Sequence, residues 1–212
     1  MKKLMMIATM LVAAMTVNAQ EAGQMFLKPM VGGTLTSVLG DNTDDVKMKL
    51  GLVAGAEFGY MFSDKFGVTG GLLYTQEGCK GETSVLGTKI DQKFNTEYIN
   101  VPILANYYII PGLAVKAGIQ PGFNIKSKYK MDKVEVDMKD NMKKVDFSIP
   151  VGLSYEIGNF VIDARYNIGL TKIYNDKKTS IGDGTTITTE GVKQRNSVFM
   201  LTLGYKIQFY FS

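Results

Sequence analysis

Six charged residues stand out because each lies on the small or polar side of a segment in which apolar residues alternate with other types. They are Glu57, Lys116, Glu156, Asp163, Arg165 and Lys206, three of each sign. An isolated charge that is removed from water is costly, so buried charges are normally paired. The pattern therefore predicts an ion-pair and hydrogen-bond network that closes the interior of the fold, or a gate if the network can rearrange.

Residue types that commonly carry enzyme chemistry are scarce. The 212-residue chain has no histidine, which removes the commonest general base and the commonest metal ligand, and Cys79 is its only cysteine. The acids Asp41, Asp44 and Asp45 leave open a calcium site or a solvated loop, although their spacing is not that of an EF-hand. We predict no enzyme, no catalytic residue and no cofactor. Cys79 is expected to be unpaired or to pair between molecules.

The first 19 residues have the layout of a cleavable secretory signal peptide. Lys2 and Lys3 precede an apolar stretch from Leu4 to Val17, and Val17-Asn18-Ala19 is a suitable cleavage site. A stretch of 14 residues would span only about 21 Å as a helix, which is short of the ~30 Å hydrocarbon core of a membrane. We therefore expect export, with residues 20–212 forming one domain. The formal net charge of +4 is too mild for a nucleic-acid-binding protein.

The rest of the chain shows repeated two-residue alternation, which is the period of a β-strand. The clearest case is the C-terminal segment, where Phe199, Leu201, Leu203, Tyr205 and Ile207 share one face. The eight predicted strands cover residues 25–36, 50–62, 66–75, 99–107, 113–126, 145–156, 160–171 and 199–211.

The predicted connections alternate in length. Short turns at 63–65, 111–112 and 158–159 contain typical turn residues, whereas residues 37–48, 78–93, 127–144 and 174–195 form long polar segments. Short turns at one end and long loops at the other are typical of bacterial outer-membrane barrels. The fold class is therefore all-β: an eight-stranded antiparallel transmembrane β-barrel with short periplasmic turns and long extracellular loops.

Three features favour a membrane barrel over the alternative, a secreted lipocalin-like barrel. The polar strand faces are rich in glycine and small residues, which suits a crowded interior better than a water-facing surface. Aromatic residues gather near strand ends and would form a girdle at the membrane interface: Tyr60, Phe62, Phe66, Tyr107, Tyr108, Tyr155 and Phe160. Each apolar face also has five to seven residues, enough for a tilted membrane crossing.

At this point the chain resembles the PorT-like outer-membrane β-barrel family of Bacteroidetes. The resemblance rests on Glu97–Leu104 with the pair Tyr107-Tyr108, on Lys116–Gly118 with Pro121-Gly122, on Phe147–Glu156 (FSIPVGLSYE) and on Ala164–Leu170. The resemblance covers nearly the whole mature chain and implies an outer-membrane location and an eight-stranded barrel. It implies little about activity, but the family name adds a component of a protein secretion apparatus to the candidate functions.

The expected partners follow from this architecture. Gly204 followed by Ile207, Phe209 and Phe211 resembles the C-terminal signal that barrel-insertion machinery reads, with Ser212 displacing the usual terminal aromatic residue. Outer-membrane lipids and lipopolysaccharide would surround the barrel, and residues 127–144 could extend as a hairpin that recruits a protein partner by strand addition. We expect a structural or interaction role through the extracellular loops, with a narrow porin-like channel as the alternative.

Overall fold

The chain forms thirteen labelled strands in a computed structural model that describes residues 21–40, 46–85, 88–131, 134–139, 142–173, 177–181, 185–189 and 194–209. The strands are β1 (Met25–Gly40), β2 (Val46–Met61), β3 (Phe66–Val85), β4 (Thr88–Asn100), β5 (Ile103–Ile110), β6 (Leu113–Met131), β7 (Val134–Asp137), β8 (Val145–Ile157), β9 (Phe160–Gly169), β10 (Lys177–Ile181), β11 (Thr185–Thr189), β12 (Gln194–Tyr205) and β13 (Ile207–Phe209). Within this part of the chain, no helix is long and apolar enough to cross a membrane. The predicted signal peptide, residues 1–19, lies outside the described residues.

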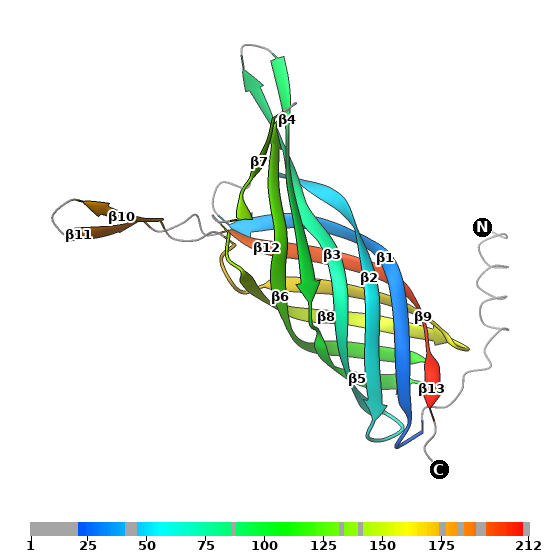
Figure 1. Cartoon of the computed structure of the whole chain (residues 1–212). Coiled ribbons are helices and arrows are strands. Elements are labelled where there is room, and N and C mark those ends of the chain that lie inside the picture. The colour runs from blue at the N-terminus through cyan, green and yellow to red at the C-terminus, as the bar shows by residue number, and fades with distance from the viewer. Residues whose placement is uncertain are drawn as a thin grey trace.

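Eight strand positions close into an antiparallel ring (Figure 1). The order is β1, β2, β3, then β4 with β5, then β6, β8, β9 and β12, and β12 pairs back with β1 to close the barrel. The fourth position is divided at Val101 and Pro102, where proline has no backbone N–H to offer the sheet. The closed ring confirms the predicted eight-stranded barrel. Closure also pairs the backbone N–H and C=O groups, which lipid cannot hydrogen-bond.

The two faces of the ring have opposite chemistry, as the alternation predicts. Outward apolar side chains are exposed, with Leu50 at 72% and Leu52 at 61%, while their inward neighbours Gly51 and Val53 are buried. Buried polar and charged side chains from all around the ring point inward. An exposed apolar face on a closed sheet fits lipid rather than water. The expectation for Tyr108 is wrong: it is 5% exposed and points inward, because it is one residue out of phase with the outward Tyr107.

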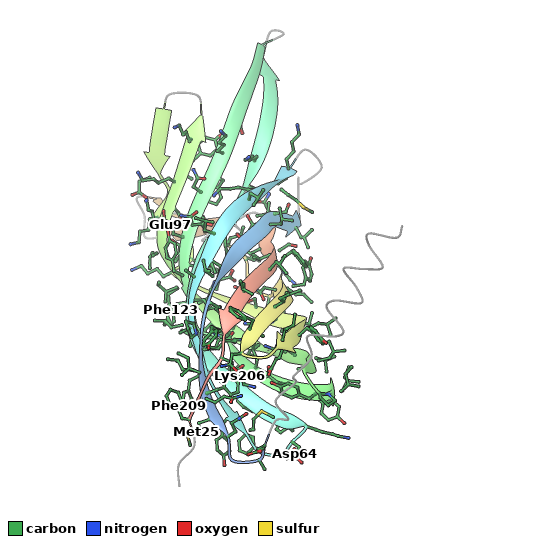
Figure 2. All side chains as sticks on the ribbon, turned by 90° about the vertical axis from the view of Figure 1, so that its right-hand side faces the viewer. Met25, Asp64, Glu97, Phe123, Lys206 and Phe209 are labelled. Atoms are coloured by element: carbon green, nitrogen blue, oxygen red, sulfur yellow. The ribbon has the colours of Figure 1, made fainter. Side chains whose placement is uncertain are left out.

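One end of the barrel carries the short connections. The turns at 63–65, 111–112 and 158–159 are confirmed, and Gly112 and Gly158 adopt positive φ values of 81° and 59° that favour glycine. Figure 2 shows Asp64 at this end, with Met25 and Phe209 nearby, and Glu97 toward the other end. Both described chain ends therefore lie on the side of the short turns.

The opposite end differs from the sequence prediction, because the polar segments expected as loops contain strand. β3 and β4 continue as a paired hairpin through Val85 and Thr88, and β6 pairs with β7 in the segment predicted to extend as a hairpin. These strands rise above the ring in Figure 1, and the separate β10–β11 hairpin projects to its side. The barrel therefore carries an extended sheet at its extracellular end.

Candidate functional site

Arg165 on β9 lies at the centre of a charged layer inside the barrel. Its Nε donates to Asp163 Oδ1 over 2.6 Å and its Nη2 donates to Asp163 Oδ2 over 2.7 Å. Nη1 donates to Glu57 Oε1 on β2. The two-residue strand period places Asp163 and Arg165 on the same inner face. A planar guanidinium matches a carboxylate with two parallel hydrogen bonds, so this pair is held rigidly.

Two lysines complete this layer from other strands. Lys28 Nζ lies 2.8 Å from Glu57 Oε2 and 3.3 Å from Asp163 Oδ2, and Lys116 Nζ lies 2.6 Å from Asp163 Oδ2. All five side chains are at most 4% exposed. We name Lys28, Glu57, Lys116, Asp163 and Arg165 the central network. Lys28 is absent from the predicted set, yet its position directly opposite Glu57 in the β1–β2 ladder is the signal that could have found it.

The remaining two predicted residues form a second pair. Lys206 Nζ lies 3.0 Å from Glu156 Oε2, and Tyr108 donates its hydroxyl hydrogen to Glu156 Oε1 over 2.6 Å. The Lys206 ammonium also lies 4.4 Å from the centre of the Phe26 ring, within the range of a cation–π contact. The six predicted side chains thus all point inward but divide between two ion-pair groups.

Apolar layers lie on both sides of the central network along the barrel axis. On the side of the short turns, Phe26, Met61, Tyr108 and Ala114 pack together. On the extracellular side, Met30, Val53, Leu73 and Met200 form a second layer. An eight-stranded barrel is only wide enough for its own side chains, and these layers fill that width.

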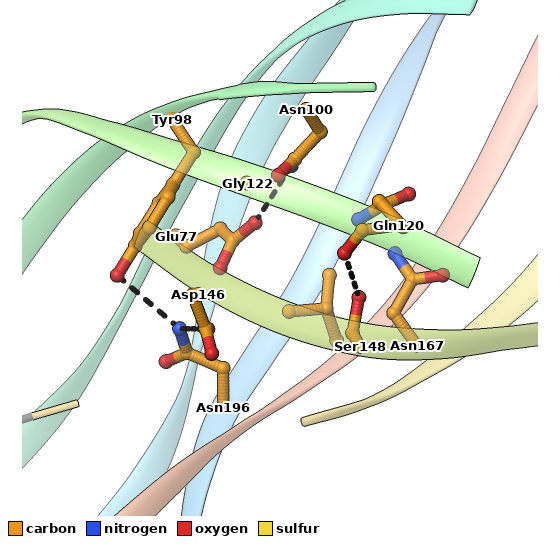
Figure 3. Close-up of a pocket in the computed structure, with 10 residues that line it drawn as sticks. Glu77, Tyr98, Asn100, Gln120, Gly122, Asp146, Ser148, Asn167 and Asn196 are labelled. Carbon is orange, nitrogen blue, oxygen red and sulfur yellow. Dashed lines mark hydrogen bonds between the residues drawn. The ribbon is translucent and has the colours of Figure 1, made fainter. Parts of the chain in front are cut away.

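A polar pocket lies above the second apolar layer (Figure 3). Glu77 accepts hydrogen bonds from Thr75 Oγ1 over 2.9 Å and from Asn100 Nδ2 over 3.2 Å, and Asp146 accepts one from Asn196 Nδ2 over 2.9 Å. The free space in the pocket is about 10 Å³, close to the room that one water molecule needs. These carboxylates are held by neutral donors, unlike the ion-paired carboxylates below.

An apolar cap covers the extracellular mouth. Val38, Phe94, Met142 and Ile173 are buried together, and Cys79 packs against them. The backbone holds the cap in place, since the Lys143 N–H donates to the Ile173 carbonyl and the Ile173 N–H donates to the Gln194 carbonyl, each over 2.9 Å. Cys79 is a free thiol that is partly buried in this cap.

On the outer face, a groove of about 290 Å³ lies where β2, β3, β4 and β6 leave the ring. Lys126 forms an exposed ion pair of 2.9 Å with Glu97, and Lys49 donates to the Glu77 carbonyl over 2.8 Å. The β2–β3 ladder shifts register between Met48 and Val53, and the β4–β6 ladder shifts at Glu97 and Tyr98. These bulges re-aim the strands outward at the mouth.

Other sequence candidates do not form a site in the described residues. Asp41, Asp44 and Asp45 lie outside them, so the structure does not test the calcium alternative. Within the described residues, no three histidine, cysteine, aspartate or glutamate side chains converge as metal ligands would. Gly32 lies inside β1 and Gly71 inside β3. At Gly32 a Cβ would meet the Leu201 carbonyl oxygen on β12 at 2.0 Å, so this glycine permits close strand approach.

The family follows from a comparison of the sequence with protein-family models. The model of the outer membrane protein beta-barrel domain matches residues 18–175. The chain belongs to this family. The match agrees with the exposed apolar ring, and together they give a location in the bacterial outer membrane. The match is to the beta-barrel domain in general and does not distinguish the PorT-like group within it. No curated protein matches the sequence.

Solved barrels show the same fold. Neisserial surface protein A is 12% identical with a TM-score of 0.54, and the alignment covers 87% of this chain and 99% of that one. Ail, the attachment invasion locus protein of Yersinia pestis, is 20% identical with a TM-score of 0.50, and covers 88% of this chain and 99% of its own. The Ail structure holds the heparin analogue sucrose octasulfate. At these identities the likeness supports the barrel fold and nothing finer.

Proposed function

We propose that this protein is a non-enzymatic outer-membrane barrel that acts through its extracellular end rather than by passing solutes through its interior. One observation carries the proposal: the central network and the apolar layers on either side of it occupy the barrel interior. A buried cation held by two carboxylates cannot leave without exposing unpaired charges, so opening this layer is costly. The extended sheet at the other end is the surface available to partners.

The absence of histidine supports the non-enzymatic part of the proposal. The surrounding lipid and lipopolysaccharide, and insertion machinery that reads the C-terminal strand, are the partners expected of any barrel of this family. Ail was solved with a sulfated sugar, so polyanions are a sensible first class of extracellular partner to test here. A protein partner at the strands of residues 127–144 remains the second class.

The first test is single-channel conductance of the refolded protein, residues 20–212, in a planar lipid bilayer. We expect insertion without discrete current steps, while a general porin in the same bilayer gives them. Steps whose size changes in Glu57→Gln or Arg165→Lys would make the interior the functional site and favour the narrow channel.

The secretion alternative needs a different measurement. Cross-linking in intact cells, followed by purification of the barrel, should recover no stable complex with secretion components if the proposal is right. Stoichiometric recovery of such components, together with loss of secretion in a deletion strain, would replace the proposal with that alternative.

A further inference from the structure

Four lysines lie side by side across the extended sheet. The pairing register places Lys47 on β2 opposite Lys80 on β3, Lys80 opposite Lys93 on β4, and Lys93 opposite Lys130 on β6. All four side chains are exposed. Neighbouring strands lie about 4.8 Å apart, so the row spans about 14 Å. We call Lys47, Lys80, Lys93 and Lys130 the lysine row.

The other face of the same sheet fixes the direction of the row. One residue nearer the barrel on each strand, Met48, Cys79, Phe94 and Tyr129 form the matching row. Cys79, Phe94 and Tyr129 pack in the apolar cap that closes the mouth. Successive strand residues point to opposite faces, so the cap holds the lysines on the outer face.

Folding alone does not account for this arrangement. Like charges directly opposite each other in neighbouring strands destabilise a sheet, and the row contains three such pairs. The next lysines toward the barrel on β6, Lys126 and Lys128, point to the same face and add to the positive charge. Acids also occur along these ladders: Glu97 pairs with Lys126, and Glu135 on β7 is paired in register with Lys130 at one end of the row. Glu82 and Asp91 are paired in register two positions beyond the row.

On β3 and β4 the row lies clear of the hydrocarbon, whereas Lys47 on β2 lies three residues beyond the exposed Leu50. Lys80 lies six residues beyond Tyr74, and Lys93 six residues beyond Ile99, the last outward aromatic or apolar residues on β3 and β4. Six residues rise about 20 Å along a strand, or about 14 Å along the normal of the membrane for a strand tilted by about 45°. Lipid phosphates at the edge of the apolar ring would meet Lys49 and Lys126 first.

The chemistry around the row selects one class of partner. On β4 and β6 the outward positions next to it hold Asn95 and Lys128, which offer hydrogen-bond donors but no aromatic platform for nucleic-acid bases. A protein interface would need an apolar centre, which these positions lack. A flat line of evenly spaced cations suits a chain with evenly spaced anions and hydroxyl groups.

We propose that the lysine row binds a sulfated glycan chain outside the membrane, with one sulfate group facing each pair of neighbouring lysines. This inference rests on the proposed function, since it names the partner of the extracellular end.

The test measures binding of the folded barrel, held in phospholipid nanodiscs, to immobilised heparin as a sulfated glycan. The variant K80Q/K93Q should bind about two- to thirtyfold more weakly, because it loses two exposed ion pairs. The matched control K139Q/K144Q removes two exposed lysines of the same extracellular end outside the row and should bind like the unchanged protein. The variant K80R/K93R keeps both charges and should retain binding.

Several outcomes would overturn the inference. Equal losses in K80Q/K93Q and K139Q/K144Q would mean that binding follows net charge. Equal binding to desulfated heparin would mean that sulfate is not recognised, and no binding to heparin at all would exclude this partner. If K80Q/K93Q binds heparin like the unchanged protein but loses binding of lipopolysaccharide that is added to the nanodiscs, the row is a lipopolysaccharide site instead. None of these results bears on conductance, so the proposed function stands or falls separately.

Discussion

The interior of the barrel and its extracellular sheet treat charge in opposite ways. Inside, the central network alternates cations and anions, and every carboxylate in it lies within 3.3 Å of at least one cation. Outside, the lysine row places four charges of one sign on adjacent strands. Both arrangements use the same two-residue strand period.

The difference shows how the surroundings decide which charge patterns a strand can carry. A buried ion without a partner loses several kcal/mol of hydration, so the interior accepts only paired charges. Water and salt screen exposed charges beyond about 8–10 Å and weaken closer pairs, so the outer face tolerates repulsion. Substitutions of interior charges should therefore change mainly the stability of the barrel, and substitutions in the lysine row should change mainly binding.

The largest expected effect comes from breaking the central network. Arg165→Ala leaves Glu57 and Asp163 without their shared guanidinium and should lower the free energy of unfolding by about 3–5 kcal/mol. Urea unfolding in lipid vesicles measures this change. A loss below about 0.5 kcal/mol would show that the network does not hold the barrel together.

Arg165→Lys sharpens the same comparison. It keeps the charge but loses the paired hydrogen bonds to Asp163, so its loss of stability should fall between those of the alanine variant and the unchanged protein. If lysine and alanine destabilise equally, geometry rather than charge is what the site requires.

A smaller effect is expected at the second ion pair. Lys206→Gln removes the charge that faces Glu156 but leaves the Tyr108 hydrogen bond in place, so we expect a loss of about 1.5–3 kcal/mol in the same unfolding measurement. Lys65→Gln, at an exposed turn on the same side of the barrel, is the control and should change stability by less than about 0.5 kcal/mol. Equal effects of the two substitutions would argue against a buried pair.

The smallest effect has the opposite sign. Lys93→Gln removes two like-charge contacts, with Lys80 and Lys130, and should stabilise the extended sheet by about 0.2–1 kcal/mol at low salt. Hydrogen exchange of the β3–β4 hairpin measures this, and the difference should vanish in about 1 M salt because of screening. Slower exchange in the unchanged protein than in the variant would contradict the repulsion.

Much of the barrel follows from the two-residue period, because lipid outside and a packed interior impose it on every crossing strand. The period also gives the inward direction of Glu57 and Arg165. It does not show that Lys28 reaches both Glu57 and Asp163, since β1 and β9 are not neighbours in the ring. For Tyr108, aromatic type suggested the interface, whereas strand phase decides that the ring lies inside.

The extended sheet was predicted only for residues 127–144. The segment 78–93 is polar in sequence, so its own pattern does not predict strands. The apolar residues that pack beneath the extended sheet come from different strands, one from each. Cys79, Phe94 and Tyr129 come together only when the β3–β4 and β4–β6 registers are known. The pattern of one segment cannot predict a cap built from several strands. The lysine row on the other face of the extended sheet could not be predicted either, because it also depends on the register between strands.

The pairing of β1 with β12 also has a consequence for how the molecule forms. Met30 lies opposite Gly204, so the contact that closes the ring joins residues from nearly opposite ends of the chain. Non-local pairing of this kind is slow, because the entropy of closing a long loop is lost before the contacts form. Until β12 arrives, β1 presents an unpaired edge that can join another chain. The seam therefore sets the order of assembly: the barrel cannot be completed until its last strand is available.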